Sequence, residues 1–161
     1  MKIIPVGVES ALVDDEDYSY LCHYRWSLGT KGEAKTNVRG DCGVWHVKRM
    51  HQFLLFAPYG FMIDRINGNS LNNRKENLRV VTNGQNRTNS GPSKNNTLGF
   101  KGIYPHGGKF QVQVFKNGKL HNEGTFSTLA EAIVVSNEAF TRLHGEHGRL
   151  NPTSNPFEEL F

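Results

Sequence analysis

A carboxylate and an amide stand at two places in the chain where a metal ion can be held. Asp64 ends a strand-like segment, and the Gly- and Asn-rich stretch after it indicates a loop leading to a second strand at Leu78–Val81. Thr82 can cap a following helix that carries Asn86. We expect this hairpin and helix to bring Asp64 and Asn86 together. One carboxylate and one amide oxygen suit Mg²⁺, which keeps several waters and takes further ligands from phosphate.

The residues before this segment indicate a mixed region of short strands and helices. The acidic run Asp14-Asp15-Glu16-Asp17 suits the first turn of a helix, where negative charge meets the positive end of the helix dipole. It lacks the spaced oxygens and glycine of a calcium loop, so we interpret it as a capped surface helix. Helical spacing returns from Met50 to Ala57 and ends at Pro58. Three short strands are expected between the two helices, at Trp26–Leu28, Ala34–Val38 and Val44–Val47.

Between Asn86 and Gly99 the composition changes to Asn, Ser, Thr, Gly, Pro and Lys. Such a stretch buries too little apolar area to order itself, so we predict a linker over residues 91–98. Its positive charge suits a phosphate backbone, and Arg87 and Lys94 are its candidate contacts.

The remaining chain predicts a small module of three strands and one helix. Asn117-Gly118 is a strong signal for a two-residue hairpin turn. Thr128 and Glu131 form a capping box, after which apolar residues recur at helical spacing until Gly145. The strands are expected at Phe100–Tyr104, Lys109–Lys116 and Lys119–Phe126.

The composition narrows the class of protein. The 161 residues allow one ordinary domain or two small ones, and the net charge of +4 with a pI near 9.1 favours a polyanionic partner. Cys22 and Cys42 lack the paired spacing of a zinc site, and with no signal-peptide core at the start they indicate a reduced cytoplasm. No apolar run approaches the roughly 20 residues that cross a bilayer, so we expect no membrane span.

The segment from Ile63 to Thr82, with Gln85-Asn86 after it, resembles the ββα-metal motif of HNH homing endonucleases of the phage and intron-encoded type. The pattern of that group runs Asp-His-Ile-Asn-Gly-Asn, then Asn-Leu-Arg, then an Asn on the helix. Three upstream stretches resemble the same group, and the C-terminal module resembles the AP2 DNA-binding domain. The upstream stretches are Asp14-Asp15-Glu16-Asp17-Tyr18, Tyr24-Arg25-Trp26-Ser27 and Met50-His51.

Together these resemblances cover nearly the whole chain and imply an α+β fold. An HNH domain is expected over residues 1–90, with the ββα-metal motif at about 62–90. The linker at 91–98 leads to an AP2-like domain of three strands and a helix over 99–151, followed by a tail at 152–161.

Carried over by position, the resemblance makes Asp64 and Asn86 the metal ligands and gives Asn77 the task of bracing the loop. Position 65 departs from the pattern. The family has there the histidine that takes a proton from the attacking water, whereas Arg65 is protonated and has no acceptor. His51 is the alternative base, and Arg65 can instead grip a phosphate. A second departure is Gln52, where an arginine is more usual. Turn chemistry explains the other asparagines, Asn67, Asn69, Asn72 and Asn73.

In the C-terminal module, Phe110, Val112 and Val114 alternate with Gln111, Gln113 and Phe115, which separates a core face from an outer face. If the module resembles an AP2 domain, the outer face enters the major groove; the alternative is an ordinary solvated sheet face. The candidate DNA contacts are Lys101, Tyr104, His106, Gln111, Gln113 and Lys116.

The sequence thus predicts an endonuclease that nicks or cleaves double-stranded DNA with Mg²⁺ or Mn²⁺, encoded by a phage and acting as a monomer in the cytoplasm of a bacterial host. Arg65 places its activity in doubt. The alternatives are a non-catalytic DNA-binding protein or regulator derived from an HNH nuclease, and a chain disarmed on purpose at position 65.

Overall fold

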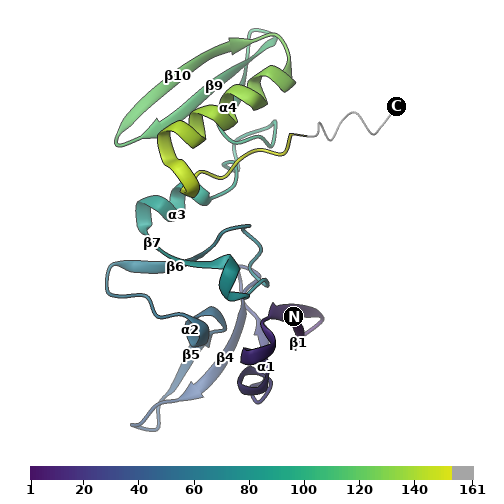
Figure 1. The fold of residues 1–161 in the computed structure, drawn as a ribbon, viewed down its shortest axis with the longest axis vertical. Helices are drawn as coiled ribbons and strands as arrows, with labels where there is room; N and C mark the ends of the chain where they lie inside the picture. The colour runs from purple at the N-terminus through teal and green to yellow at the C-terminus, as the bar shows by residue number, and fades with distance from the viewer. Residues whose placement is uncertain (154–161) are drawn as a thin grey trace. The chain divides into compact units, whose positions relative to one another are not determined.

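Separate groups of buried apolar residues divide the chain into two units, residues 1–86 and residues 87 onward (Figure 1). The structure is a computed structural model, and it describes residues 1–153. Of the predicted tail, residues 154–161 lie outside the described residues. Among the residues described, no helix is long and apolar enough to cross a bilayer.

The first unit consists of short antiparallel strands and short helices. Strands β1 and β2 form one hairpin, β3, β4 and β5 form a three-stranded sheet, and β6 and β7 form a second hairpin. The strands are β1 (Lys2–Val6), β2 (Glu9–Val13), β3 (Ser27–Leu28), β4 (Ala34–Arg39), β5 (Trp45–Arg49), β6 (Phe61–Arg65) and β7 (Leu78–Thr82). The helices are α1 (Asp15–Leu21), α2 (His51–Leu54) and the 3₁₀ turn η1 (Lys75–Asn77), and α3 (Asn83–Asn89) runs across the unit boundary.

The core of the first unit lies between the β1–β2 hairpin, α1 and the start of β4. The sequence analysis assigned no strand to this hairpin, although its inward residues are fully or almost fully buried. Gly7 permits its tight turn with a φ of +66°. The buried core residues are Ile4, Val6, Ala11, Val13, Leu21, Trp26, Ala34 and Met50.

The second unit packs one helix against one face of a sheet (Figure 1). The sheet order is β10-β9-β8, with β8 at Ile103–His106, β9 at Lys109–Lys116 and β10 at Lys119–Phe126. Helix α4 (Leu129–His144) leads into the 3₁₀ turn η2 (Gly145–His147). The expected capping box is present, because the Glu131 backbone N–H donates to Thr128 and Glu131 accepts from the Thr128 N–H.

The predicted elements around the two-residue turn are confirmed. Asn117 and Gly118 adopt φ values of 49° and +79°, which is the left-handed conformation such a turn requires. Part of the stretch predicted as a linker makes contacts within the second unit. The Asn96 side chain donates to the carbonyls of Phe100 and Ile103, and Leu98 packs against the core of the second unit.

Candidate active site

Asp64 lies near the end of β6, directly opposite Arg79 of β7. Its residue is 8% exposed, so its charge needs a partner. Nε and Nη2 of Arg79 each lie 3.0 Å from Asp64 Oδ2. The carboxylate expected to bind a metal is therefore also half of a largely buried ion pair, which the sequence analysis did not anticipate.

Arg65, the next residue of β6, is held by two side chains. Its Nη2 lies 2.9 Å from Nδ1 of His51 and donates over 3.3 Å to Oδ1 of Asn73, which is completely buried. Because a guanidinium has no acceptor, His51 must accept at Nδ1 and carry its proton on Nε2. His51 thus reaches position 65, but one of its ring nitrogens is engaged by the arginine.

Burial, together with the positive charges of Arg65 and Arg49, lowers the pKa of His51 to about 4, against the opposite effect of Glu33. Burial also lowers the pKa of Arg65, while Glu33 and Asp64 raise it. Arginine remains protonated in proteins, so at neutral pH the site contains a neutral imidazole beside a charged guanidinium.

The loop between β6 and β7 is built from asparagine side chains. Asn67, Asn69 and Asn72 each accept from the backbone N–H two residues further on, which is the predicted turn chemistry. Asn77, 7% exposed, accepts from the Asn67 N–H at 3.1 Å and donates to the Asn72 carbonyl at 2.9 Å. Asn77 therefore joins the two ends of this loop. Asn73 does more than make a turn, since it also binds Arg65.

The same loop is tied to the first residues of the unit. The backbone of Leu12 in β2 donates to the Leu71 carbonyl and accepts from the Asn73 N–H. Asp14 accepts from the Lys75 N–H at 2.8 Å and from Arg74 Nε at 3.3 Å. Glu16 and Asp17 pair with the Lys75 ammonium at 2.5 Å and 3.1 Å, and Asp15 pairs with the amino terminus of Met1 at 2.6 Å. The acidic run is thus a helix start, as predicted, and also the anchor of the loop.

Asn86, the second expected ligand, lies on α3 and is half-buried. Thr82 starts this helix in a reciprocal arrangement with Gln85, in which the Thr82 N–H donates to Gln85 Oε1 at 2.9 Å and the Gln85 N–H donates to Thr82 Oγ1 at 3.3 Å. Residues 1–153 hold no group of three or more His, Cys, Asp or Glu side chains arranged for a metal. The donors that fit are one buried carboxylate and one amide, which suit a water-rich Mg²⁺ site completed by phosphate.

Comparisons with known proteins agree with this geometry. Residues 57–88 match the family described as HNH endonuclease, a span that holds β6, the asparagine loop, β7 and most of α3. The chain carries an HNH endonuclease family domain. A protein of Acanthamoeba polyphaga mimivirus named as an HNH endonuclease is 29% identical over 144 residues, covering 88% of this chain and 74% of that protein.

Protein 3.8 of Escherichia phage T7 is 33% identical over 94 residues, covering 57% of this chain and 77% of that protein. At this identity and coverage the chain belongs to the same family as protein 3.8. No solved structure matches the chain. The predicted resemblance to HNH endonucleases is confirmed, and the AP2-like and homing assignments stay predictions.

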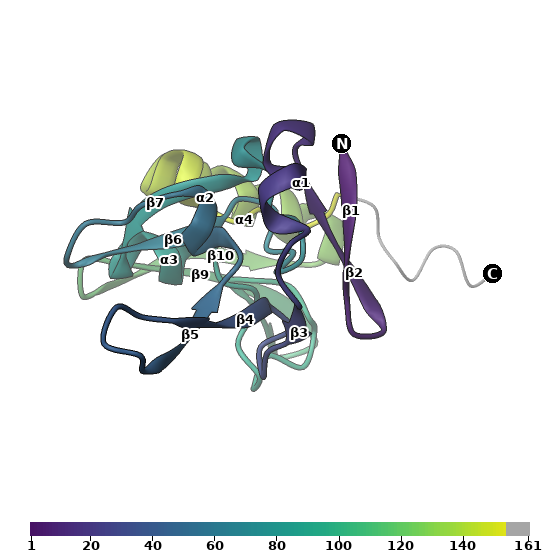
Figure 2. The same cartoon turned by 90° about the horizontal axis from the view of Figure 1, so that it is seen from below.

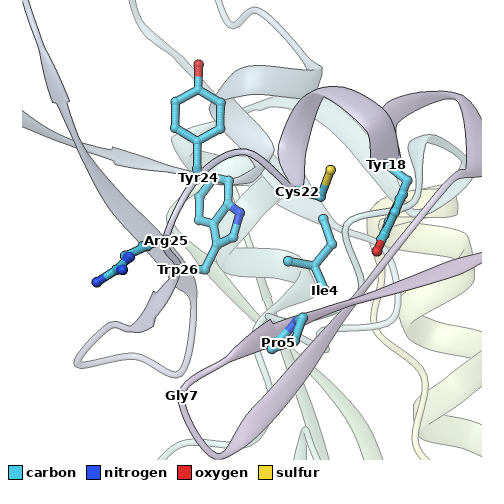
Figure 3. Close-up of a pocket in the computed structure, with 8 residues that line it drawn as sticks. All are labelled: Ile4, Pro5, Gly7, Tyr18, Cys22, Tyr24, Arg25 and Trp26. Carbon is cyan, nitrogen blue, oxygen red and sulfur yellow. The ribbon is translucent and has the colours of Figure 1, made fainter.

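The first unit also contains an open hollow of about 440 Å³, and Asp64 is not among the residues that line it (Figure 3). Figure 3 shows Ile4 between Trp26 and Tyr18, with Arg25 on the far side from Tyr18. Trp26, Tyr24 and Phe53 pack ring against ring nearby, with centroids 4.8 to 5.9 Å apart. These aromatic residues of the motif resemblance build the core rather than the site.

The outer face of the second unit's sheet carries most of the predicted DNA contacts. Tyr104 pairs with Gln111, and Gln113 pairs with Asn122, so their side chains share the face that α4 does not cover. His106 lies on the same face and is exposed. Arg87, on α3, and Lys94, before the sheet, are also exposed but do not belong to this face.

Two of the predicted DNA contacts are engaged within the second unit in this structure. Lys116 has the strand parity of Val112 and Val114, and its ammonium donates to the Leu143 carbonyl on the helix side. Lys101 precedes β8, and its ammonium donates to the carbonyls of Thr88 and Ser90. Burial lowers the pKa of Lys101 to about 8, with a further contribution from Arg149. The ammonium groups of both lysines therefore donate hydrogen bonds to backbone carbonyls of their own unit.

Sequence reasoning missed Arg79 and Asn73 as site residues. Arg79 belongs to the Asn-Leu-Arg pattern, and its place opposite Asp64 follows from the hairpin register. No local signal distinguishes Asn73 from the turn asparagines around it. Its role depends on complete burial beside Arg65.

Proposed function

We propose that the chain is an HNH-type nuclease that hydrolyses phosphodiester bonds of double-stranded DNA with Mg²⁺ or Mn²⁺, and that Arg65 limits its rate. The observation that carries the proposal is the position of Asp64 at the end of β6 inside the matched HNH domain, with Asn77 closing the loop beside it.

Asp64 and Asn86 are the residues that would hold the metal. When bound, such a metal stabilises the charge that develops on the phosphate and on the leaving oxygen. Arg79 shares Asp64 Oδ2 and partly neutralises the carboxylate, which weakens the attraction of the site for a cation. Asn77 keeps the loop between β6 and β7 closed. It thereby helps to position Asp64, which is in β6, and β7, which leads into the helix that carries Asn86.

Arg65 cannot accept the proton of an attacking water. General-base help contributes about 10² to 10⁴ in rate, so the site with Arg65 is expected to work slowly. What Arg65 can do is bind a phosphate through two parallel N–H donors. To do so, it would exchange its contact with His51 Nδ1 for one with the DNA.

A second candidate function is binding of duplex DNA without cleavage. It is favoured by the two arginines that occupy the site, Arg79 on the carboxylate and Arg65 on His51 and Asn73. The two guanidiniums make the surroundings of Asp64 attractive to phosphate, whether or not the bond is cut.

The outer sheet face of the second unit is proposed to supply site preference. Gln111 and Gln113 point to this face, and glutamine can pair with the edge of adenine in the major groove. The phage relative supports the further proposal that the protein is phage-encoded and acts inside a bacterial host cell. A monomer is the simplest form in which it would do so.

The deciding experiment measures nicking of supercoiled plasmid with Mg²⁺ or Mn²⁺. Arg65→His should raise the rate by about 10² to 10⁴, and only with a divalent metal present. Asp64→Ala added to Arg65→His should remove the gain. Arg25→His, an exposed arginine of the same unit, is the matched control and should leave the rate unchanged.

Two other outcomes of the Arg65→His experiment would each contradict a different part of the proposal. If Arg65→His binds the plasmid but stays silent, the non-catalytic function is correct. If the unaltered protein already cuts well and Arg65→His changes nothing, the base lies elsewhere and His51 is the first residue to test.

A further inference from the structure

The β4–β5 hairpin of the first unit has one face turned to the core and one face without cover. On the inward face, Ala34 and Thr36 are buried, and the Lys48 ammonium lies 4.2 Å from the centroid of the Phe53 ring. Both views show the turn between β4 and β5 at the end of the hairpin far from β1 and α1 (Figures 1 and 2).

The opposite face is a continuous row of side chains across both strands. The register pairs Lys35 with Arg49, Asn37 with Val47, and Arg39 with Trp45, so all six share this face. Trp45 is 65% exposed and Val47 is 61% exposed, although large apolar side chains are more often buried. No other ring of the described chain packs against Trp45. This face, defined by these six residues, is called the ribbon face below.

The charge of the ribbon face selects its partner. Its charged members are Lys35, Arg39 and Arg49, all positive. Of the two acids nearest along the chain, Glu33 is buried and accepts from Arg49 Nε at 3.2 Å, and Asp41 lies in the turn at the tip. A basic row with an exposed tryptophan at its outer end, next to the turn, suits a polyanion that also offers apolar surface, as DNA does through its bases.

We propose that the ribbon face is a second DNA-binding site, which enters the major groove of the duplex that the HNH domain acts on. β3 pairs only with Ala34 and Lys35, so from Thr36 to the turn the hairpin is a two-stranded β-ribbon. Such a ribbon fits this groove, where Asn37 can pair with an adenine edge and Arg39 with a guanine edge. Trp45 and Val47 supply apolar contact for thymine methyl groups, and Lys35 and Arg49, the pair at the end of the row away from the turn, are the phosphate contacts. The inference rests on the proposed function for its partner, but on no feature of the catalytic site.

Tryptophan emission of the full chain tests it, because Trp45 is exposed while Trp26, the other tryptophan, is 7% exposed. Titration with a mixed-sequence duplex should change the emission and protect it from acrylamide. Trp45→Phe should remove both effects. Arg39→Glu should weaken binding about tenfold or more and lower the slope of log K against log salt by about one or more, since it removes a phosphate or base contact.

Two controls use neighbouring residues. His46→Ala alters the exposed residue beside Trp45 on the opposite face, and it should bind DNA normally. Lys2 lies on β1, outside the ribbon face. Lys2→Glu makes the same charge change as Arg39→Glu and should weaken DNA binding less. Far-UV circular dichroism checks that the variants remain folded.

The outcomes separate the two proposals. If the chain binds duplex DNA but Trp45 emission is unchanged and Arg39→Glu matches Lys2→Glu, the ribbon face is not a DNA site, while the proposed function stands. If Trp45 emission follows protein concentration instead of DNA, the face joins two copies of the chain. Absence of duplex binding at low salt overturns both proposals.

Discussion

The β6–β7 hairpin of the HNH domain and the β9–β10 hairpin of the second unit each join two antiparallel strands, but different interactions hold the two connections. Asn117-Gly118 alone turns β9 into β10, and the strands are then held by the apolar core beneath α4. The loop from β6 to β7 is instead held by polar groups: the distant Leu12 and Asp14, and the side chain of Asn77 within the loop itself.

The difference shows where each unit can change without losing its fold. The candidate contacts of the second unit stand on an open sheet face, separate from the core behind it. In the first unit the candidate residues Asp64, His51 and Asn77 are themselves buried and hydrogen-bonded within the fold. A substitution there should therefore affect stability and function together, and the following predictions test that contrast.

The largest effect on stability should come from acid. The folded pKa of His51 is about 4, below the 6.5 of the free side chain, so the unfolded chain binds a proton first as the pH falls. Stability is then fully present above pH 6.5 and is lost toward pH 4, by about 1.4 kcal/mol per pH unit and about 3 kcal/mol in total. Urea unfolding at each pH measures this.

His51→Gln is the control, because its amide oxygen can still accept from Arg65 while the group does not titrate. The difference between the two unfolding profiles should slope between pH 6.5 and 4 and be flat above. Parallel profiles would show that His51 is not buried as a neutral ring.

The next effect is expected from Asn77→Ala. It leaves the Asn67 N–H and the Asn72 carbonyl without their side-chain partner and should cost about 1 to 3 kcal/mol of unfolding free energy. Asn69→Ala, in the same loop but exposed, should cost about 1 kcal/mol or less. Equal costs for the two variants would mean that the loop is not closed through Asn77.

The smallest effect on stability is expected on the second unit's sheet. Gln111→Ala and Gln113→Ala should each change the unfolding free energy by no more than about 0.5 kcal/mol. Each should also relax base preference at one position by about 1 to 3 kcal/mol in a selection from randomised DNA sites. A stable variant with unchanged selectivity would reject the DNA assignment of this face.

Most of the elements could be predicted from the sequence because their signals are local. The turn at Asn117-Gly118 and the helix starts at Thr82 and Thr128 depend on residues within a few positions. Strand parity was also readable. It places Lys116 with Val112 and Val114, on the face opposite Gln111 and Gln113.

The β1–β2 hairpin was missed for a different reason. Pro5 inside β1 weakens the strand signal, and the hairpin is stabilised by burial of Ile4, Val6, Ala11 and Val13 against α1 and Trp26. That burial exists only in the folded unit.

The sequence by itself determined the position of Asp64 at a strand end, the asparagine turns after it, and the absence of a proton acceptor at position 65. The tertiary structure alone decided that Arg79 neutralises Asp64, that Arg65 rests on His51 and Asn73, and that Lys101 closes backbone carbonyls. The physical reason is that a buried charge must find a partner, and which partner it finds depends on residues brought together from distant parts of the chain.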